Sequence, residues 1–147
     1  MKFIIALLAA LVIASSVQAQ RIGDCDWRTS ARNLGVPWEE YSKVFSNGKV
    51  RIALLDTVEP AAGALHLLII SPPYGELGSP QCKVVSAGDT IGFADMDFKG
   101  LNADYNPEIG LIFRIPVKGY SGGERGPWQP LTVTLNQATG LIKAWLE

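Results

Sequence analysis

The sequence predicts an α+β, β-rich domain: a single antiparallel sheet or flattened sandwich with one or two short N-terminal helices. Short apolar segments are separated by turns rich in Gly, Pro, Asn and Asp, which is typical of strands. No helical pattern lies between these segments after residue 48. Because parallel strands need long, usually helical crossovers, this arrangement favours antiparallel pairing. An all-β sandwich is the alternative.

The N-terminus has the pattern of a secretory signal peptide. Lys2 precedes the apolar run 3–13, and Val17 and Ala19 supply the small residues of a cleavage site. The apolar run is too short for a permanent membrane span. We therefore expect a signal peptide at 1–19 and one exported, soluble domain at 20–147, periplasmic or secreted.

Residues 26–46 carry the predicted helices. Apolar residues at helical spacing and Pro37 at a first-turn position favour two short helices broken at Gly35–Pro37. In the alternative, residues 41–45 form a strand that ends in a two-residue Asn-Gly hairpin turn. Three tryptophans are expected from their spacing to be packing residues: Trp27, Trp38 and Trp145.

Seven strands are expected, in chain order, at 49–58, 64–71, 83–86, 90–94, 109–118, 131–135 and 141–146. The segment 64–71 is apolar on both alternate faces, which predicts a strand buried on both sides. It contains His66, the only histidine. Pro116 places the strand 109–118 at a sheet edge or near its own end. Residues 95–108 and 119–130 are expected to be loops.

The chain has two cysteines, Cys25 and Cys82. An even pair in an exported domain predicts one disulfide bond. Neither cysteine has a second at metal-binding spacing, and one histidine cannot complete a zinc site with them. The disulfide is therefore the favoured interpretation.

Charge argues against two classes of partner. The chain carries 13 basic and 14 acidic side chains, a net charge of −1, and the basic residues are scattered. Nucleic-acid binding needs a concentrated cationic surface. We therefore expect neither nucleic acid nor an anionic membrane surface as a partner.

A hydrolase motif is present but incomplete. Residues 119–123 read G-Y-S-G-G, which matches the nucleophile-elbow pattern around Ser121. The following Gly- and Pro-rich residues cannot form the helix that this chemistry requires, and His66 precedes the serine instead of following it. His66 is expected to be a core or half-exposed histidine with a backbone partner. A small hydrolase using Ser121 and His66 is an alternative, but the sequence favours a non-catalytic protein.

The polar segment 95–106 raises the question of a metal. Calcium prefers several oxygen ligands from one flexible loop, and the candidate ligands here are Asp95, Asp97 and Asp104. Lys99 occupies a ligand position and no bidentate Glu follows, which favours an ordinary surface loop. No cofactor is predicted, and a calcium-stabilised structural module is the alternative.

Aromatic residues in the predicted loops indicate binding. Tyr105 lies in 95–108, and Tyr120 and Trp128 lie in 119–130. Amphipathic rings near Asp, Asn and Gln are common in sites that bind a glycan or a protein. The sequence therefore predicts an exported, non-catalytic binding or accessory protein that uses these two loops and an unknown protein or glycan partner.

Overall fold

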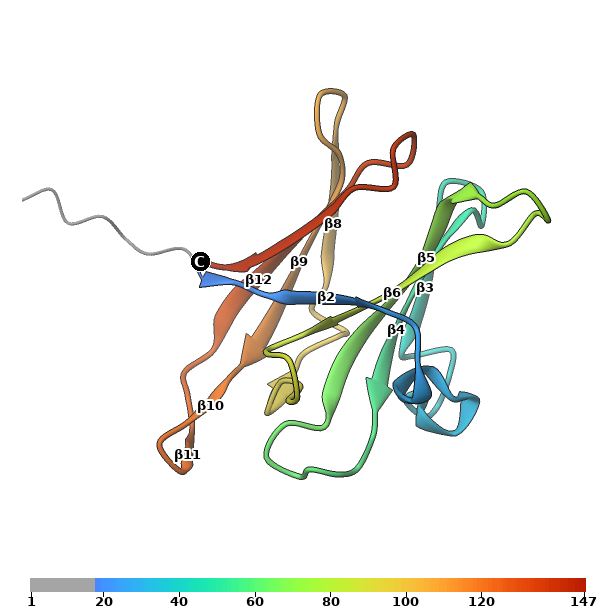
Figure 1. Cartoon of the computed structure of the whole chain (residues 1–147). Coiled ribbons are helices and arrows are strands. Elements are labelled where there is room, and N and C mark those ends of the chain that lie inside the picture. Colours follow the sequence, from blue (N-terminus) through green and yellow to red (C-terminus); the bar gives the residue numbers. More distant parts are fainter. Residues whose placement is uncertain (1–17) are drawn as a thin grey trace, which may run out of the picture.

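The computed structural model describes residues 18–147 as two antiparallel sheets packed face to face (Figure 1). Most of the predicted signal peptide, residues 1–17, lies outside the described residues. The elements are β1 (Gln18–Ala19), β2 (Arg21–Asp24), η1 (Trp27–Thr29), η2 (Ala31–Asn33), β3 (Ser42–Phe45), β4 (Val50–Asp56), β5 (Leu65–Tyr74), β6 (Pro80–Ser86), β7 (Asp95–Met96), β8 (Asn102–Asn106), β9 (Gly110–Lys118), β10 (Tyr120–Ser121), β11 (Glu124–Arg125), β12 (Gln129–Leu135) and β13 (Ile142–Leu146). The predicted β-rich, antiparallel architecture is confirmed.

The sheets differ in strand order. The six-stranded sheet runs β1-β13-β12-β9-β7, and β8 also pairs with β9. The five-stranded sheet runs β2-β6-β5-β4-β3, and β10 and β11 form a small separate hairpin. The N-terminal strand segment passes from one sheet to the other: Ala19 pairs with β13, and Arg21 pairs with β6.

The main hydrophobic core lies between the two sheets. Leu67 and Ile69 of β5 contribute to it from the five-stranded sheet, and Phe113 and Ile115 of β9 contribute from the six-stranded sheet. All four are completely buried. The alternation of these positions along each strand directs every second side chain into the space between the sheets.

A second, smaller core lies on the outer face of the five-stranded sheet. It contains Ala53, Leu55, Leu68 and Val84. Cys25 and Leu34, from the N-terminal segment that contains η1 and η2, pack against it. Strand β5 is the central strand of this sheet and is therefore covered on both faces, as the segment 64–71 predicted.

The predicted N-terminal helices are not found. Residues 26–46 contain only two single 3-10 turns, η1 and η2, followed by strand β3. Tyr41 and Phe45 are four residues apart, an even spacing that places both side chains on one face of a strand as well as of a helix. In the structure both face the core, with ring centroids 6.4 Å from Phe98 and 5.0 Å from Phe113, respectively.

In place of the second predicted helix, β3 and β4 form a hairpin, but its turn is longer than the two-residue Asn-Gly turn of the predicted alternative. Phe45 pairs with Val50, which leaves a four-residue loop at 46–49. Ser46, Asn47 and Gly48 have positive φ values of 53°, 56° and 82°. Three successive left-handed residues bring the chain back for pairing, where a two-residue turn had been expected.

Three other predictions need correction. Residues 90–94 were expected to be a strand but form none. The predicted loop 95–108 contains strands β7 and β8, and the predicted loop 119–130 contains the β10–β11 hairpin. Strand β8 was missed because four of its five side chains are exposed, so it lacks an apolar period. Trp27 and Trp38 are exposed by 64% and 57%, so neither is a packing residue.

Candidate binding site

One end of the sandwich combines loops from both sheets, and we call it the pocket end. It is formed by loops 57–64, 87–94 and 119–128, at the bottom of Figure 1. Strands β4, β6 and β9 end there, and β5 and β12 begin there. The opposite end carries the tips of four hairpins, between β3 and β4, β5 and β6, β8 and β9, and β12 and β13.

His66 and Ser86 form a buried pair on the outer face of the five-stranded sheet. His66 Nδ1 lies 2.7 Å from Ser86 Oγ, and Arg28 Nη1 donates a hydrogen bond of 3.0 Å to the same oxygen. Arginine can only donate, and the fully buried Ser86 hydroxyl needs an acceptor for its own hydrogen. We therefore assign that hydrogen to Nδ1, which leaves the ring neutral with its proton on Nε2.

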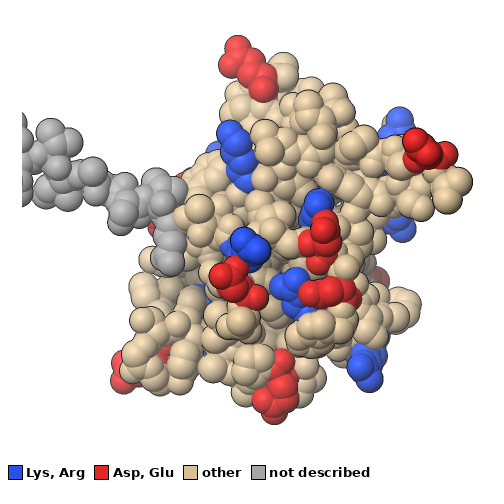
Figure 2. All heavy atoms as spheres, in the orientation of Figure 1, with Lys and Arg blue, Asp and Glu red and all other residues tan. Residues whose placement is uncertain are grey.

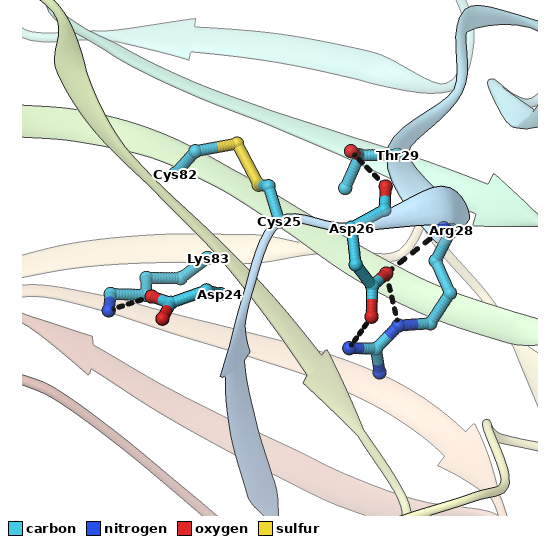
Figure 3. The surroundings of a disulfide bond; sticks show 7 residues. All are labelled: Asp24, Cys25, Asp26, Arg28, Thr29, Cys82 and Lys83. Carbon is cyan, nitrogen blue, oxygen red and sulfur yellow. Dashed lines mark hydrogen bonds and ion pairs between the residues drawn. A yellow bond between two sulfur atoms is a disulfide. The ribbon is translucent and has the colours of Figure 1, made fainter.

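Arg28 is held in place by Asp26. The Asp26 carboxylate accepts from Arg28 Nε at 2.8 Å and from Nη2 at 2.9 Å. The same carboxylate caps η1 by accepting from the backbone N–H of Arg28 at 3.0 Å (Figure 3). These charge-assisted bonds from Arg28 lower the pKa of Asp26.

The predicted disulfide is confirmed and fixes this segment to the sheet. Cys25, next to Asp26, is bonded to Cys82 of β6 (Figure 3). The backbone N–H of Cys25 also donates to the carbonyl of Cys82 at 3.3 Å. Residues 25–28 therefore form a rigid cover beside the His66–Ser86 pair.

The environment of His66 disfavours its charged form. The residue is only 4% exposed. Burial, and next the positive charge of Arg28, lower its pKa from 6.5 to about 4, although Asp26 and Asp56 oppose the change. His66 is therefore neutral at pH 7 and can offer a polar N–H without a charge.

A pocket opens beside this network. It has a volume of about 270 Å³ and is lined by Asp26, Trp27, Arg28, Thr57, Pro60, His66, Asp89 and Thr90. Among the described residues, every buried side-chain nitrogen or oxygen has a hydrogen-bond partner. The only hydrogen bond of the His66 ring is made by Nδ1. Nε2 is therefore not sealed in the core, and because His66 lines the pocket we infer that Nε2 faces it.

The structure separates the three aromatic residues predicted to bind. Tyr120 and Trp128, 42% and 49% exposed, lie at the pocket end, where Lys118 Nζ sits 4.7 Å from the centre of the Trp128 ring. Tyr105 pairs with Leu111 near the start of β9, whereas Tyr120 follows the last residue of that strand. At about 3.3 Å per residue, the two ends of β9 lie more than about 20 Å apart.

A second pocket at the pocket end involves the predicted loop 119–130. It is lined by residues of this loop, of loop 87–94, of the six-stranded sheet and of the N-terminal segment: Gln20, Ala87, Ile91, Phe93, Gly119, Tyr120, Ser121, Gly126, Pro127, Gln129 and Leu146. Tyr120 thus stands at the mouth of a cavity whose wall includes the core residue Phe93. This places an exposed ring beside a partly apolar opening.

Ser121 and His66 are not joined as a hydrolytic pair would be. Ser121 is exposed in β10, where its backbone pairs with Glu124. The serine that is hydrogen bonded to His66 is Ser86, which no solvent reaches. The expected backbone partner of His66 is thus a buried side chain.

The three candidate calcium ligands do not come together. Asp95 accepts from the N–H of Met96, Asp97 from that of Gly100 and Asp104 from that of Tyr105. Within residues 18–147, no group of three or more His, Cys, Asp or Glu side chains could hold a metal ion. Each aspartate instead satisfies its own local backbone.

The surface carries charges of both signs. On the face in Figure 2, acidic and basic side chains alternate without a large patch of one sign. Among the ion pairs of the molecule, Arg21 and Asp89 lie 2.9 Å apart and Lys83 pairs with Asp24. No helix among residues 18–147 is long and apolar enough to cross a membrane.

The fold and site define a two-sheet antiparallel β-sandwich with a buried histidine at one end. No family model matches the sequence, and no curated protein and no solved structure matches it. The site is thus interpreted from its own residues.

Sequence reasoning missed the partners of His66. Asp26, Arg28 and Ser86 were not among the candidate residues that the sequence pointed to. A polar ring inside an apolar strand does indicate that a buried partner exists. The partner's identity depends on the pairing of β5 with β6 and on the path of the N-terminal segment.

Proposed function

We propose that this chain is an exported, non-catalytic binding protein that presents its pocket end to a ligand or partner. The observation that carries the proposal is that two exposed rings lie at the pocket end: Tyr120, which lines a pocket there, and Trp128, whose sequence neighbours Pro127 and Gln129 line the same pocket. Tyrosine and tryptophan provide large contact areas at low entropic cost and are enriched where proteins bind.

Two further features support the proposal. The sole histidine has its Nδ1 occupied by a serine that solvent cannot reach, so this pair does not present a nucleophile to a substrate. The disulfide is compatible with an oxidising compartment. Both features fit an exported binding module better than a hydrolase.

Glycan and peptide arrays probed with the disulfide-bonded chain would test the proposal. The Tyr120→Ala/Trp128→Ala double variant should weaken array binding by at least tenfold, since exposed aromatic anchors carry much of a typical interface energy. Tyr105→Ala is the matched control, because this ring is 60% exposed but lies at the other end of β9. Binding that survives the double variant, or that is lost only in Tyr105→Ala, would contradict the proposal.

A further inference from the structure

We infer that the pocket beside His66 binds one neutral sugar residue. This inference deepens the proposed function by giving a ligand class to a second part of the pocket end. It rests on the only buried histidine of the chain, whose free ring nitrogen reaches a pocket with an exposed tryptophan at its wall.

The size of the pocket fits a single ring. Its volume of about 270 Å³ lies just below the range of about 300–1,000 Å³ that is usual for small-molecule sites. Trp27 is 64% exposed although it lines the pocket, so its indole face is available for contact. The C–H face of a pyranose is flat and apolar enough to stack on such a ring, while its hydroxyl groups remain free to hydrogen bond.

The polar groups match hydroxyls, which both donate and accept. The Nε2–H of His66 offers a donor. The Asp26 carboxylate is 42% exposed and keeps acceptor capacity beyond its bonds to Arg28, and the exposed Thr90 hydroxyl can take either role. Asp89 adds a further acceptor at the rim.

The charge balance argues against ionic ligands. The positive charge of Arg28 is neutralised by Asp26, and Asp89 is paired with Arg21. The pocket therefore has no unpaired cation to hold an anion. A simple cation would leave the His66 N–H without an acceptor, and an unmatched polar group in a binding site costs affinity.

The experiment titrates the disulfide-bonded chain with glucose, galactose, mannose, N-acetylglucosamine and cellobiose at millimolar concentrations. The single histidine gives one Cε1–H signal in the NMR spectrum, which reports directly on the pocket. At least one neutral sugar should shift this signal in a saturable way. Glucuronate and glucosamine, the charged counterparts, should bind at least tenfold more weakly.

Two exposed tryptophans provide the matched variants. Trp27→Ala should weaken sugar binding at least tenfold, whereas Trp38→Ala, which removes a ring that is 57% exposed but does not line the pocket, should change it less than twofold. Both substitutions are at exposed positions, so both chains should fold. No saturable shift with any sugar, equal effects of the two variants, or preferential binding of a charged sugar would overturn the inference.

The two proposals can fail separately. If no sugar shifts the His66 signal while array binding still depends on Tyr120 and Trp128, only the sugar inference falls. If the sugar titration succeeds and the Tyr120→Ala/Trp128→Ala variant keeps all array binding, the proposed role of those two rings falls.

Discussion

The buried His66 should make the stability of this protein depend on pH in a defined window. In the unfolded chain its pKa is about 6.5, and in the folded protein burial lowers the pKa to about 4. Between these two values the unfolded chain binds a proton that the folded protein does not. The folded state is therefore favoured above pH 6.5, and this contribution is lost as the pH falls toward 4.

The size of the effect follows from the displacement of the pKa. At about 1.4 kcal/mol per pKa unit, a change from 6.5 to about 4 corresponds to about 3 kcal/mol. That is a large part of the 5–15 kcal/mol typical of a small domain. Asp24 and Asp26, whose pKa values are lowered by their basic partners, add a further loss at lower pH.

The assay compares urea unfolding of the wild-type chain and His66→Gln at several pH values from 7.5 to 4. Glutamine can still hydrogen bond to Ser86 but does not titrate, while Asp24 and Asp26 remain in both proteins. The wild-type chain should lose about 3 kcal/mol more than the variant over this range. Parallel pH profiles would refute the reasoning, as would an NMR titration of the single histidine with a midpoint near 6.5.

Three further predictions concern stability. Replacing Cys25 and Cys82 by serine should lower the free energy of unfolding by about 4 kcal/mol in the chain-entropy model, since the bridge spans 57 residues; an unchanged denaturation midpoint relative to the oxidised chain would contradict this. Gly110→Ala should lower the free energy of unfolding by at least about 2 kcal/mol, because φ is 113° and a Cβ would lie 2.2 Å from a carbonyl oxygen of β12. Gly119→Ala is the control: a Cβ there meets nothing within 4 Å, so thermal stability should change little. Equal effects of the two substitutions would exclude the steric explanation. Phe113→Ala should cost about 3–5 kcal/mol in chemical denaturation because the ring is fully buried between the sheets, and a loss below about 1 kcal/mol would argue against this packing.

The sequence predicted the strands whose side chains alternate or are apolar throughout. Strands β4, β5, β9, β12 and β13 were all expected close to their observed positions, because burial of one or both faces leaves a readable period. The second sheet was left open, as either a flattened sandwich or a single sheet. Periodicity shows which faces are buried but not which other strands cover them.

The errors have the same origin. Tyr41 and Phe45 occur at a spacing that places both side chains on one face of either a helix or a strand. The spacing therefore does not distinguish the two structures, and tertiary packing determines which one forms. Strand β8 is held by backbone pairing with β9 and carries no apolar signal. The sequence identified the candidate binding residues Tyr105, Tyr120 and Trp128. Only the antiparallel path of the chain shows that Tyr105 and Tyr120 lie at opposite ends of β9.

The transfer of the N-terminal segment between the sheets has a consequence for maturation. Cleavage after Ala19, as the sequence predicts, would remove both residues of β1. The six-stranded sheet would then have five strands, and the backbone of Trp145 and Leu146, which β1 now pairs with, would become an open edge. Gln20, whose N–H donates to the carbonyl of Ala144 at 2.9 Å, would become the first residue of the processed chain. The precursor and the processed protein would therefore differ in the edge that each presents to a neighbouring strand.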